Sequence, residues 1–215
     1  MRETMSRRHF LTTTGIFILV GQAASTVGPS PSWGAAAKVG EPTPDFTAPS
    51  TKGTPVSLDA YKGKVVVLEW TNHECPYVRK HYESGNMQAL QREATGQGVI
   101  WLTLISSAKG EQGFVSAAQA DELTTTRKAA PTAVLLDEKG SVGHLYGATN
   151  TPHMYVVDKT GMLVYAGAID DRPTTRRSDV QGANNYVRAA LDSVATGQPV
   201  KTPVTRAYGC TVKYS

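Results

Sequence analysis

The chain has 215 residues, of which 40% are hydrophobic and 19% charged, and its formal net charge is +4. This length suits one domain at roughly 150 residues per domain and is long enough to bury a core. No lysine- and arginine-rich run follows the first ten positions, so nucleic-acid binding is disfavoured. Two cysteines are too few for a disulfide scaffold or a four-thiolate zinc site, but they can form one bridge or one reactive pair.

The first 37 residues have the order of an export signal. Arg7 and Arg8 stand in the segment Ser6-Arg7-Arg8-His9-Phe10-Leu11, which precedes a short apolar run and a small-residue stretch ending at Ala37. This order predicts a signal peptide over residues 1–37, cleaved after Ala37. The paired arginines match a twin-arginine signal, so we expect export by the twin-arginine translocase, with a Sec signal as the alternative.

Export predicts a periplasmic or secreted protein. The apolar run is far shorter than the ~20 residues that span a bilayer, so no membrane span is expected after cleavage. Cleavage would remove three arginines and one glutamate, which lowers the net charge from +4 by 2 to +2. The sequence leaves Met1 and Met5 open as the start. The mature chain, residues 38–215, is expected to form one domain with a core over about 55–196, and both cysteines would lie in an oxidising compartment.

The mature chain predicts alternating strands and helices. Residues 38–54 are rich in proline and glycine and should be extended, with strand pieces around 45–47. Unalternated apolar runs predict buried strands, and 3.6-residue spacing predicts helices. The expected strands are 65–70, 99–105 and 132–137, with a hairpin of 153–158 and 162–167. The expected helices are 77–92, interrupted at 84–86, then 117–130, 141–146 and 184–195.

This order predicts an α/β fold with a mostly parallel sheet. Strands that alternate with helices pair in parallel, and the closing hairpin adds an antiparallel edge. Trp70 and Trp101 fall in the expected buried strands and are predicted to be core residues. The tail over 197–215 has no regular pattern and is expected to be irregular.

Cys75 is the candidate reactive residue. It follows a buried strand and directly precedes Pro76, which suits the first position of a helix. The partial positive charge of a helix N-terminus favours a thiolate there. The alternative is an inert buried cysteine, because free cysteines are often buried. The order of strand, cysteine, proline and helix favours the reactive interpretation.

This arrangement resembles the thioredoxin-like superfamily in its redoxin branch, the AhpC/TSA and peroxiredoxin-like proteins, over nearly the whole mature chain. Thr151-Pro152 stands where that family keeps a cis-proline opposite its cysteine, so the resemblance implies that Pro152 shapes a substrate groove. It also implies a thioredoxin-like fold, a central mixed sheet flanked by helices, with an N-terminal extension and an irregular tail. Three segments are similar to a narrower peroxiredoxin-like subgroup: 72–78 (NHECPYV), 167–171 (GAIDD) and 209–214 (GCTVKY).

The sequence departs from both better-known redoxin patterns. Val78 stands where thioredoxins have the second cysteine of C-x-x-C, so a disulfide within that motif cannot form. Peroxiredoxins have P-x-x-x-[ST]-x-x-C, but here Leu68 replaces the proline and Asn72 replaces the hydroxyl residue. Thr71 is one residue out of register and is a weak substitute.

Cys210 lies 135 positions after Cys75 and is the candidate resolving thiol. A reversible Cys75–Cys210 disulfide is the first hypothesis, and a permanent bridge that pins the tail is the alternative. The supporting residues are Asn72, His73, Glu74, Pro76 and Thr151. His73 and Glu74 either tune the thiol or are exposed loop residues. Arg172 is a candidate for stabilising the thiolate.

These residues predict an exported thiol–disulfide oxidoreductase that acts on protein thiols or disulfides and is recycled by an unidentified electron donor. A thiol peroxidase that forms a sulfenic acid on Cys75 is the second hypothesis. A non-enzymatic binding or assembly module with a structural disulfide is the third. No cofactor is expected. A metal site of Cys75, His73 and His81 is disfavoured, because the C-x-x-x-C pair of copper-delivery relatives is missing.

Overall fold

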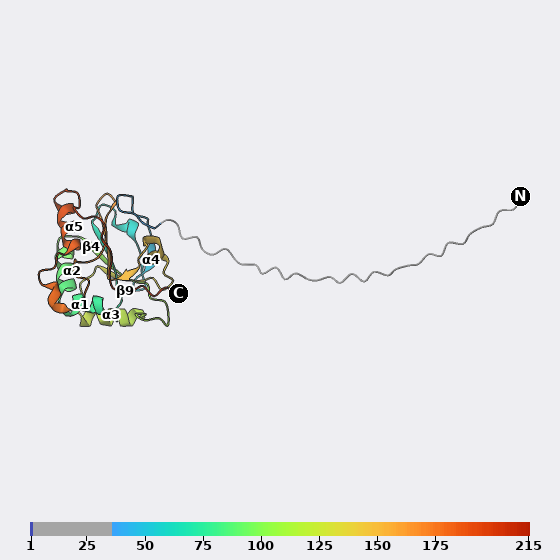
Figure 1. The fold of residues 1–215 in the computed structure, drawn as a ribbon, viewed down its shortest axis with the longest axis horizontal. Coiled ribbons are helices and arrows are strands. Elements are labelled where there is room, and N and C mark those ends of the chain that lie inside the picture. The colour runs from blue at the N-terminus through green and yellow to red at the C-terminus, as the bar shows by residue number, and fades with distance from the viewer. Residues whose placement is uncertain (2–35) are drawn as a thin grey trace. The chain divides into compact units, whose positions relative to one another are not determined.

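The computed structural model describes Met1 and residues 36–215 (Figure 1). The chain divides into two units, Met1–Ser32 and Trp33–Ser215, and every helix and strand below belongs to the second. Most of the predicted signal peptide, including Arg7 and Arg8, lies outside the described residues. Ala37 is described, and its N–H donates to the carbonyl of Leu145 at 3.0 Å. Among the described residues, no helix has the length and apolar character needed to cross a membrane.

A five-stranded mixed sheet forms the centre of the domain, in the order β5-β4-β3-β7-β8. Strand β3 pairs in parallel with β4, and β4 with β5, whereas β7 is antiparallel to both β3 and β8. The fold is therefore the predicted α/β class, with the hairpin at one edge. The strands are β3 (Val66–Trp70), β4 (Ile100–Ile105), β5 (Ala133–Leu136), β7 (His153–Val157) and β8 (Leu163–Gly167).

Strand β3 is buried on both faces because each face is covered by a separate layer. Val67 packs in a core with side chains of α1, α2 and α5, and Leu68 packs on the opposite side with α4. Figure 1 shows α1, α2 and α5 on one side of the sheet and α4 on the other. A strand between two layers carries an unbroken apolar run, as the sequence does here. The helices are α1 (Pro76–Glu83), α2 (Asn86–Gly96), α3 (Ala117–Thr126), α4 (Ser141–Tyr146) and α5 (Tyr186–Ala195).

Local sequence explains where the helices begin and end. The expected interruption at 84–86 separates α1 from α2, because Ser84 and Gly85 end one helix and begin the next. Helix α3 starts at a capping box of Ser116 and Gln119 and ends four residues before the expected position. Lys128 has a positive φ of 53°, which terminates the helix.

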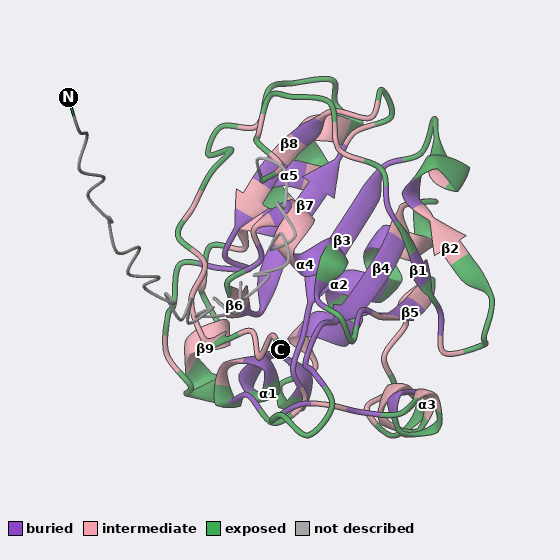
Figure 2. Ribbon diagram, turned by 90° about the vertical axis from the view of Figure 1, so that its right-hand side faces the viewer, coloured by how far each residue is buried: buried purple, intermediate pink, exposed green. Residues whose placement is uncertain are grey.

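Short strands fix the two ends of the domain. In the lead-in, β1 (Thr47–Pro49) pairs with β2 (Pro55–Ser57), slightly after the expected strand pieces. Two 3-10 helices that the sequence pattern did not predict are η1 (Leu58–Tyr61) and η2 (Arg177–Val180). In the tail, β9 (Cys210–Thr211) pairs with β6 (Asn150–Thr151), so the tail is more ordered than predicted. Figure 2 shows this pair beside the ends of the buried strands β3 and β7.

Glu69 is a fully buried acid in the middle of β3. Its carboxylate accepts hydrogen bonds from Tyr82 (2.8 Å), Gln91 (3.0 Å), Trp101 Nε1 (2.8 Å) and Thr103 (3.1 Å). Both predicted core tryptophans are buried, and the Nε1–H of Trp101 has Glu69 as its hydrogen-bond acceptor. Burial raises the pKa of Glu69 although these four hydrogen bonds act against the shift.

We predict that Glu69 makes folding stability fall as pH rises from its ordinary pKa of 4.5 toward its raised folded-state pKa. In that window the folded state keeps a proton that the unfolded state has lost, so the free energy of unfolding declines. Glu69→Gln should remove this decline, because its amide does not ionise. Urea unfolding at several pH values tests this, and a Glu69→Gln curve that parallels wild type contradicts it. Glu69→Ala should cost about 3 kcal/mol, since four donors lose their acceptor.

Candidate active site

Cys75 lies at the junction of β3 and α1. It is the N-cap residue of α1, and Pro76 occupies the first helical turn as predicted. The side chain is completely buried. A short turn links strand to helix, in which the Cys75 N–H donates to the Asn72 carbonyl at 3.1 Å. The sulfur therefore sits at the positive end of a helix, where a thiolate is favoured.

The segment around Pro152 lies against the sulfur from the opposite side. The Thr151–Pro152 peptide bond is cis, as the family resemblance implies. The Thr151 carbonyl lies 3.1 Å from Cys75 Sγ and accepts a hydrogen bond from the thiol. Both residues are buried, so this side of the sulfur is closed to solvent.

Cys210 reaches the same place from the tail. Its backbone pairs with Thr151 in the β6–β9 ladder, and its N–H donates to Cys75 Sγ at 3.5 Å. Both cysteines are free thiols in the structure. The structure thus brings together the two cysteines and the cis-proline, which are separated by up to 135 positions in the sequence.

The pKa values of the two thiols are shifted in opposite directions. Burial opposes ionisation of Cys75, but hydrogen bonds from the Cys210 side chain, from the backbones of Cys210 and Val78 and from the Thr151 side chain outweigh it and lower the pKa. Burial and the contact with Cys75 raise the pKa of Cys210 to about 11. Cys75 therefore ionises first, and Cys210 keeps the proton that it donates to the Cys75 sulfur.

Asn72 and Glu74 brace the neighbouring loop. Asn72 Oδ1 accepts from the Glu74 N–H at 2.9 Å, and its Nδ2 donates to the Gln112 carbonyl at 3.2 Å. Glu74 accepts from the Gly113 N–H at 2.7 Å. A Cβ at Gly113 would lie 2.3 Å from Asn72 Cγ, and its φ of +88° also favours glycine. These polar atoms hold a loop against the strand end.

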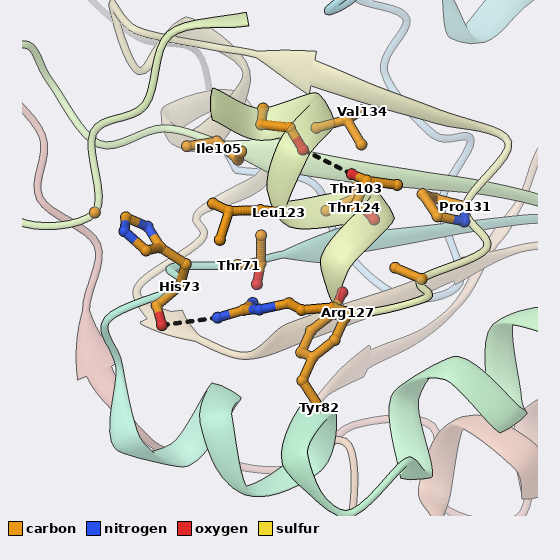
Figure 3. Close-up of a pocket in the computed structure, with 13 residues that line it drawn as sticks. Thr71, His73, Tyr82, Thr103, Ile105, Leu123, Thr124, Arg127, Pro131 and Val134 are labelled. Atoms are coloured by element: carbon orange, nitrogen blue, oxygen red, sulfur yellow. Dashed lines mark hydrogen bonds between the residues drawn. The ribbon is translucent and has the colours of Figure 1, made fainter. Parts of the chain in front are cut away.

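His73 belongs to a pocket between the strand end and α3 (Figure 3). The His73 carbonyl accepts from Arg127 Nη2 at 2.9 Å, and that guanidinium stacks 4.8 Å from the Tyr82 ring centroid. Burial lowers the pKa of His73, which keeps its ring neutral. Thr71 lines the same pocket, and its hydroxyl has no hydrogen-bond partner among the described residues. Neither residue hydrogen-bonds to the Cys75 sulfur in the part of the chain described.

The structure corrects the hypothesis that Arg172 stabilises the thiolate, and it places His81 of the disfavoured metal site. The Arg172 side chain is 54% exposed and pairs with Asp171 at 3.4 Å, so it does not stabilise a buried thiolate. His81 is buried and contacts Tyr208 and Asn86. Tyr208 was missed by sequence reasoning, and its place two residues before Cys210 was the available signal.

We predict that Cys210→Ala raises the pKa of Cys75, because the thiol donor to the Cys75 sulfur is lost. The thiolate ultraviolet absorbance as a function of pH measures this shift. In wild type, one thiol should ionise early and the second only near pH 11. An unchanged Cys75 titration in the variant contradicts the prediction, and Thr211→Ala, beside Cys210 in β9, is the matched control.

Comparisons with known proteins agree with the fold. The chain is 26% identical over 144 residues to the thioredoxin-like protein YneN of Bacillus subtilis (strain 168), which covers 66% of this chain and 79% of YneN. The fold matches an uncharacterised conserved protein from Geobacillus kaustophilus with a TM-score of 0.72 and 24% identity, over 84% of this chain and 94% of that one.

A second structure, a hypothetical protein from Sinorhizobium meliloti 1021, has the same TM-score of 0.72 at 23% identity and covers 84% of this chain and 96% of its own. At these identities the structures show the thioredoxin-like fold alone. The model of the AhpC/TSA family matches residues 39–166, which is more than half of the chain and includes Cys75 and Pro152. The chain belongs to the AhpC/TSA family.

Proposed function

We propose that this protein is an exported thiol–disulfide oxidoreductase in which Cys75 attacks a substrate disulfide and Cys210 resolves the product. One observation carries the proposal. The Cys210 N–H donates to Cys75 Sγ while the Cys210 backbone pairs with Thr151, so a thiol from the tail is held beside the thiol at the helix start. The lowered pKa of Cys75 and the raised pKa of Cys210 give the two thiols different roles.

The exchange has two steps. The Cys75 thiolate attacks one sulfur of the substrate disulfide, a mixed disulfide forms, and the other substrate sulfur leaves as a thiolate. Cys210 then loses its proton and attacks Cys75 Sγ, which releases the second substrate sulfur and leaves a Cys75–Cys210 disulfide. Two electrons pass from the protein to the substrate, and an external dithiol must reduce the protein again.

Substrate access requires the tail to move. Cys75 is completely buried, with the cis-proline segment on one side and β9 on the other. The β6–β9 ladder has only two residue pairs, Asn150 with Thr211 and Thr151 with Cys210. A substrate segment must displace this ladder to reach Cys75, together with the adjoining bond from the Val212 N–H to the Thr149 carbonyl, and the tail returns for the second step.

The peroxidase alternative has less support. The hydroxyl that peroxiredoxins place three residues before the attacking cysteine is missing here, because Asn72 stands at that position and is turned toward the 112–113 loop, and Thr71 is turned toward the pocket of Figure 3. The groups that do contact Cys75 Sγ include the N–H and the thiol of Cys210, which place a second sulfur beside the first. These contacts favour exchange between sulfur atoms.

We predict that Cys75→Ser abolishes the protein's catalysis of insulin disulfide reduction, with dithiothreitol as the reductant, because the attacking thiolate is lost. The catalysed rate should fall at least 100-fold. Cys210→Ser should instead trap mixed disulfides with substrate, since nothing resolves them. Reaction of wild type with hydrogen peroxide, followed by stopped flow, should be no faster than that of a free thiol. Insulin reduction by Cys75→Ser at the wild-type rate sinks the proposal, and fast peroxide reduction would favour the peroxidase.

Export has its own test. Changing Arg7 and Arg8 to lysine should leave the precursor inside bacterial cells, because the twin-arginine translocase reads both guanidinium groups. Cell fractionation with an antibody to the protein measures this. Changing Lys38 to arginine, just past the predicted cleavage point, is the matched control. Processing and export of the twin-lysine variant at the wild-type level would point to the Sec route.

A further inference from the structure

A buried polar cluster lies beside the site, and the proposed exchange does not use it. It contains Lys80 and His81 of α1, Asp170 after β8, and Tyr208 of the tail. The first three are 1%, 0% and 2% exposed. Charged and polar groups buried this deeply are costly unless they are paired, so their contacts need an explanation.

The Tyr208 hydroxyl completes the hydrogen bonding of the cluster. It donates to Asp170 Oδ1. It lies 3.1 Å from His81 Nε2 and accepts from Lys80 Nζ at 3.3 Å. The Asn86 amide donates to His81 Nδ1 at 2.8 Å, which leaves the proton of a neutral ring on Nε2, pointing at Tyr208. The one donor and two acceptor sites of the hydroxyl are therefore all used.

The charge states fit this assignment. Burial lowers the pKa of His81 to about 3, so the ring is neutral at ordinary pH. Burial, followed by the hydrogen bond to Asp170, raises the pKa of Tyr208, so its hydroxyl stays a donor. Lys80 supplies the counter-charge to Asp170 at 3.6 Å from Oδ2 and also donates to the Arg172 carbonyl at 2.6 Å. Asp170 Oδ2 accepts no hydrogen bond among the described residues.

The cluster connects the tail to the helix that begins after Cys75. Tyr208 is two residues before Cys210, and its ring also contacts Tyr77 of α1 at 5.8 Å between centroids. Gly209, between Tyr208 and Cys210, approaches β6 closely. A Cβ on Gly209 would lie 2.1 Å from the Thr151 carbonyl oxygen. The tail therefore has little freedom between the hydrogen-bonded hydroxyl of the half-buried Tyr208 and the pairing of Cys210 with Thr151.

We infer that Tyr208 is a positioning residue for the Cys75–Cys210 pair: its hydroxyl, bound to Asp170, Lys80 and His81, latches the tail to α1 and holds Cys210 against the Cys75 sulfur. This inference rests on the proposed function. The latch has two opposite effects. It raises the effective concentration of Cys210 for the second step, and it keeps the tail over Cys75 and so slows the first.

Reaction of the reduced full chain with the aromatic disulfide dithiobis(nitrobenzoate) separates the two steps. The Cys75 thiolate attacks the reagent and releases one thionitrobenzoate in a step that depends on reagent concentration. Cys210 then displaces the second thionitrobenzoate in a first-order step and leaves the protein disulfide. Tyr208→Phe should speed the first release and slow the second, each by about tenfold, because buried partners of the hydroxyl are left unpaired.

The opposite directions distinguish a latch from a loss of general stability. Tyr186→Phe, which removes the same atom outside the cluster, should leave both rates unchanged. Equal rates in Tyr208→Phe and wild type, or two rates that change in the same direction, overturn the inference. If Tyr208→Phe does not fold, His81→Leu removes one contact to the hydroxyl and should show the same opposite changes at about threefold, and its failure to do so also overturns the inference.

Failure of the proposed function gives a different result. A wild-type protein that releases one thionitrobenzoate and never the second has no working pair, and the proposed function and the latch then both fall. A wild-type protein that releases both, with a Tyr208→Phe variant that matches it in each step, leaves the proposed function standing and removes only the latch.

Discussion

The backbone pairing of Thr151 with Cys210 is the contact on which the arrangement of the two thiols depends. It fixes the register of the tail on β6. In that register the Cys210 N–H donates a hydrogen bond to the Cys75 sulfur. A slip of one residue would turn the Cys210 side chain to the other face of the ladder. The pairing also covers Cys75, so the same two residues that supply the second thiol close the site to solvent.

In the proposed exchange, the site uses distant residues for what thioredoxins do within one motif. Val78 stands where C-x-x-C proteins have their second thiol, and here it contributes a backbone amide that favours the Cys75 thiolate. The second thiol comes from the C-terminal tail instead of the helix that follows Cys75, so other contacts must fix its position. Tyr208 before it and Tyr214 after it attach the tail through their side chains, and the Val212 N–H adds a backbone bond to the Thr149 carbonyl at 3.0 Å. Tyr214 donates to the Ala148 carbonyl at 2.6 Å and stacks on His144.

Two buried acids lie in the layer that contains Cys75, and they are satisfied in different ways. Glu69 receives four neutral donors, so burial dominates and raises its pKa. Asp170 faces the ammonium group of Lys80 and the hydroxyl of Tyr208. A buried pair of this kind is strongly destabilising to break, because one partner is left uncompensated. Asp170 therefore ties the tail to α1, whereas Glu69 ties β3 to α2 and β4.

The sequence by itself determined the fold class and the place of Cys75. The apolar runs of β3 and β4 and the Cys75-Pro76 junction depend on local propensity and on burial by adjacent layers, which are visible in residue order. Family resemblance added the cis bond before Pro152. These features need only neighbouring residues or a known fold.

Only the tertiary structure decided how the remaining groups are used. The sequence singled out Cys210 but could not place it, because its position depends on contacts between distant segments. The β6–β9 pairing joins Thr151 to Cys210, 59 positions apart, and the Tyr208 hydroxyl contacts His81, 127 positions away. Three titratable residues were candidates for tuning the Cys75 thiol, but each is bonded to another group. The His73 carbonyl accepts from Arg127, the Glu74 carboxylate accepts from the Gly113 N–H, and Arg172 pairs with Asp171. Local patterns set which residues are buried, whereas the partners of a buried polar atom are set by packing between distant segments.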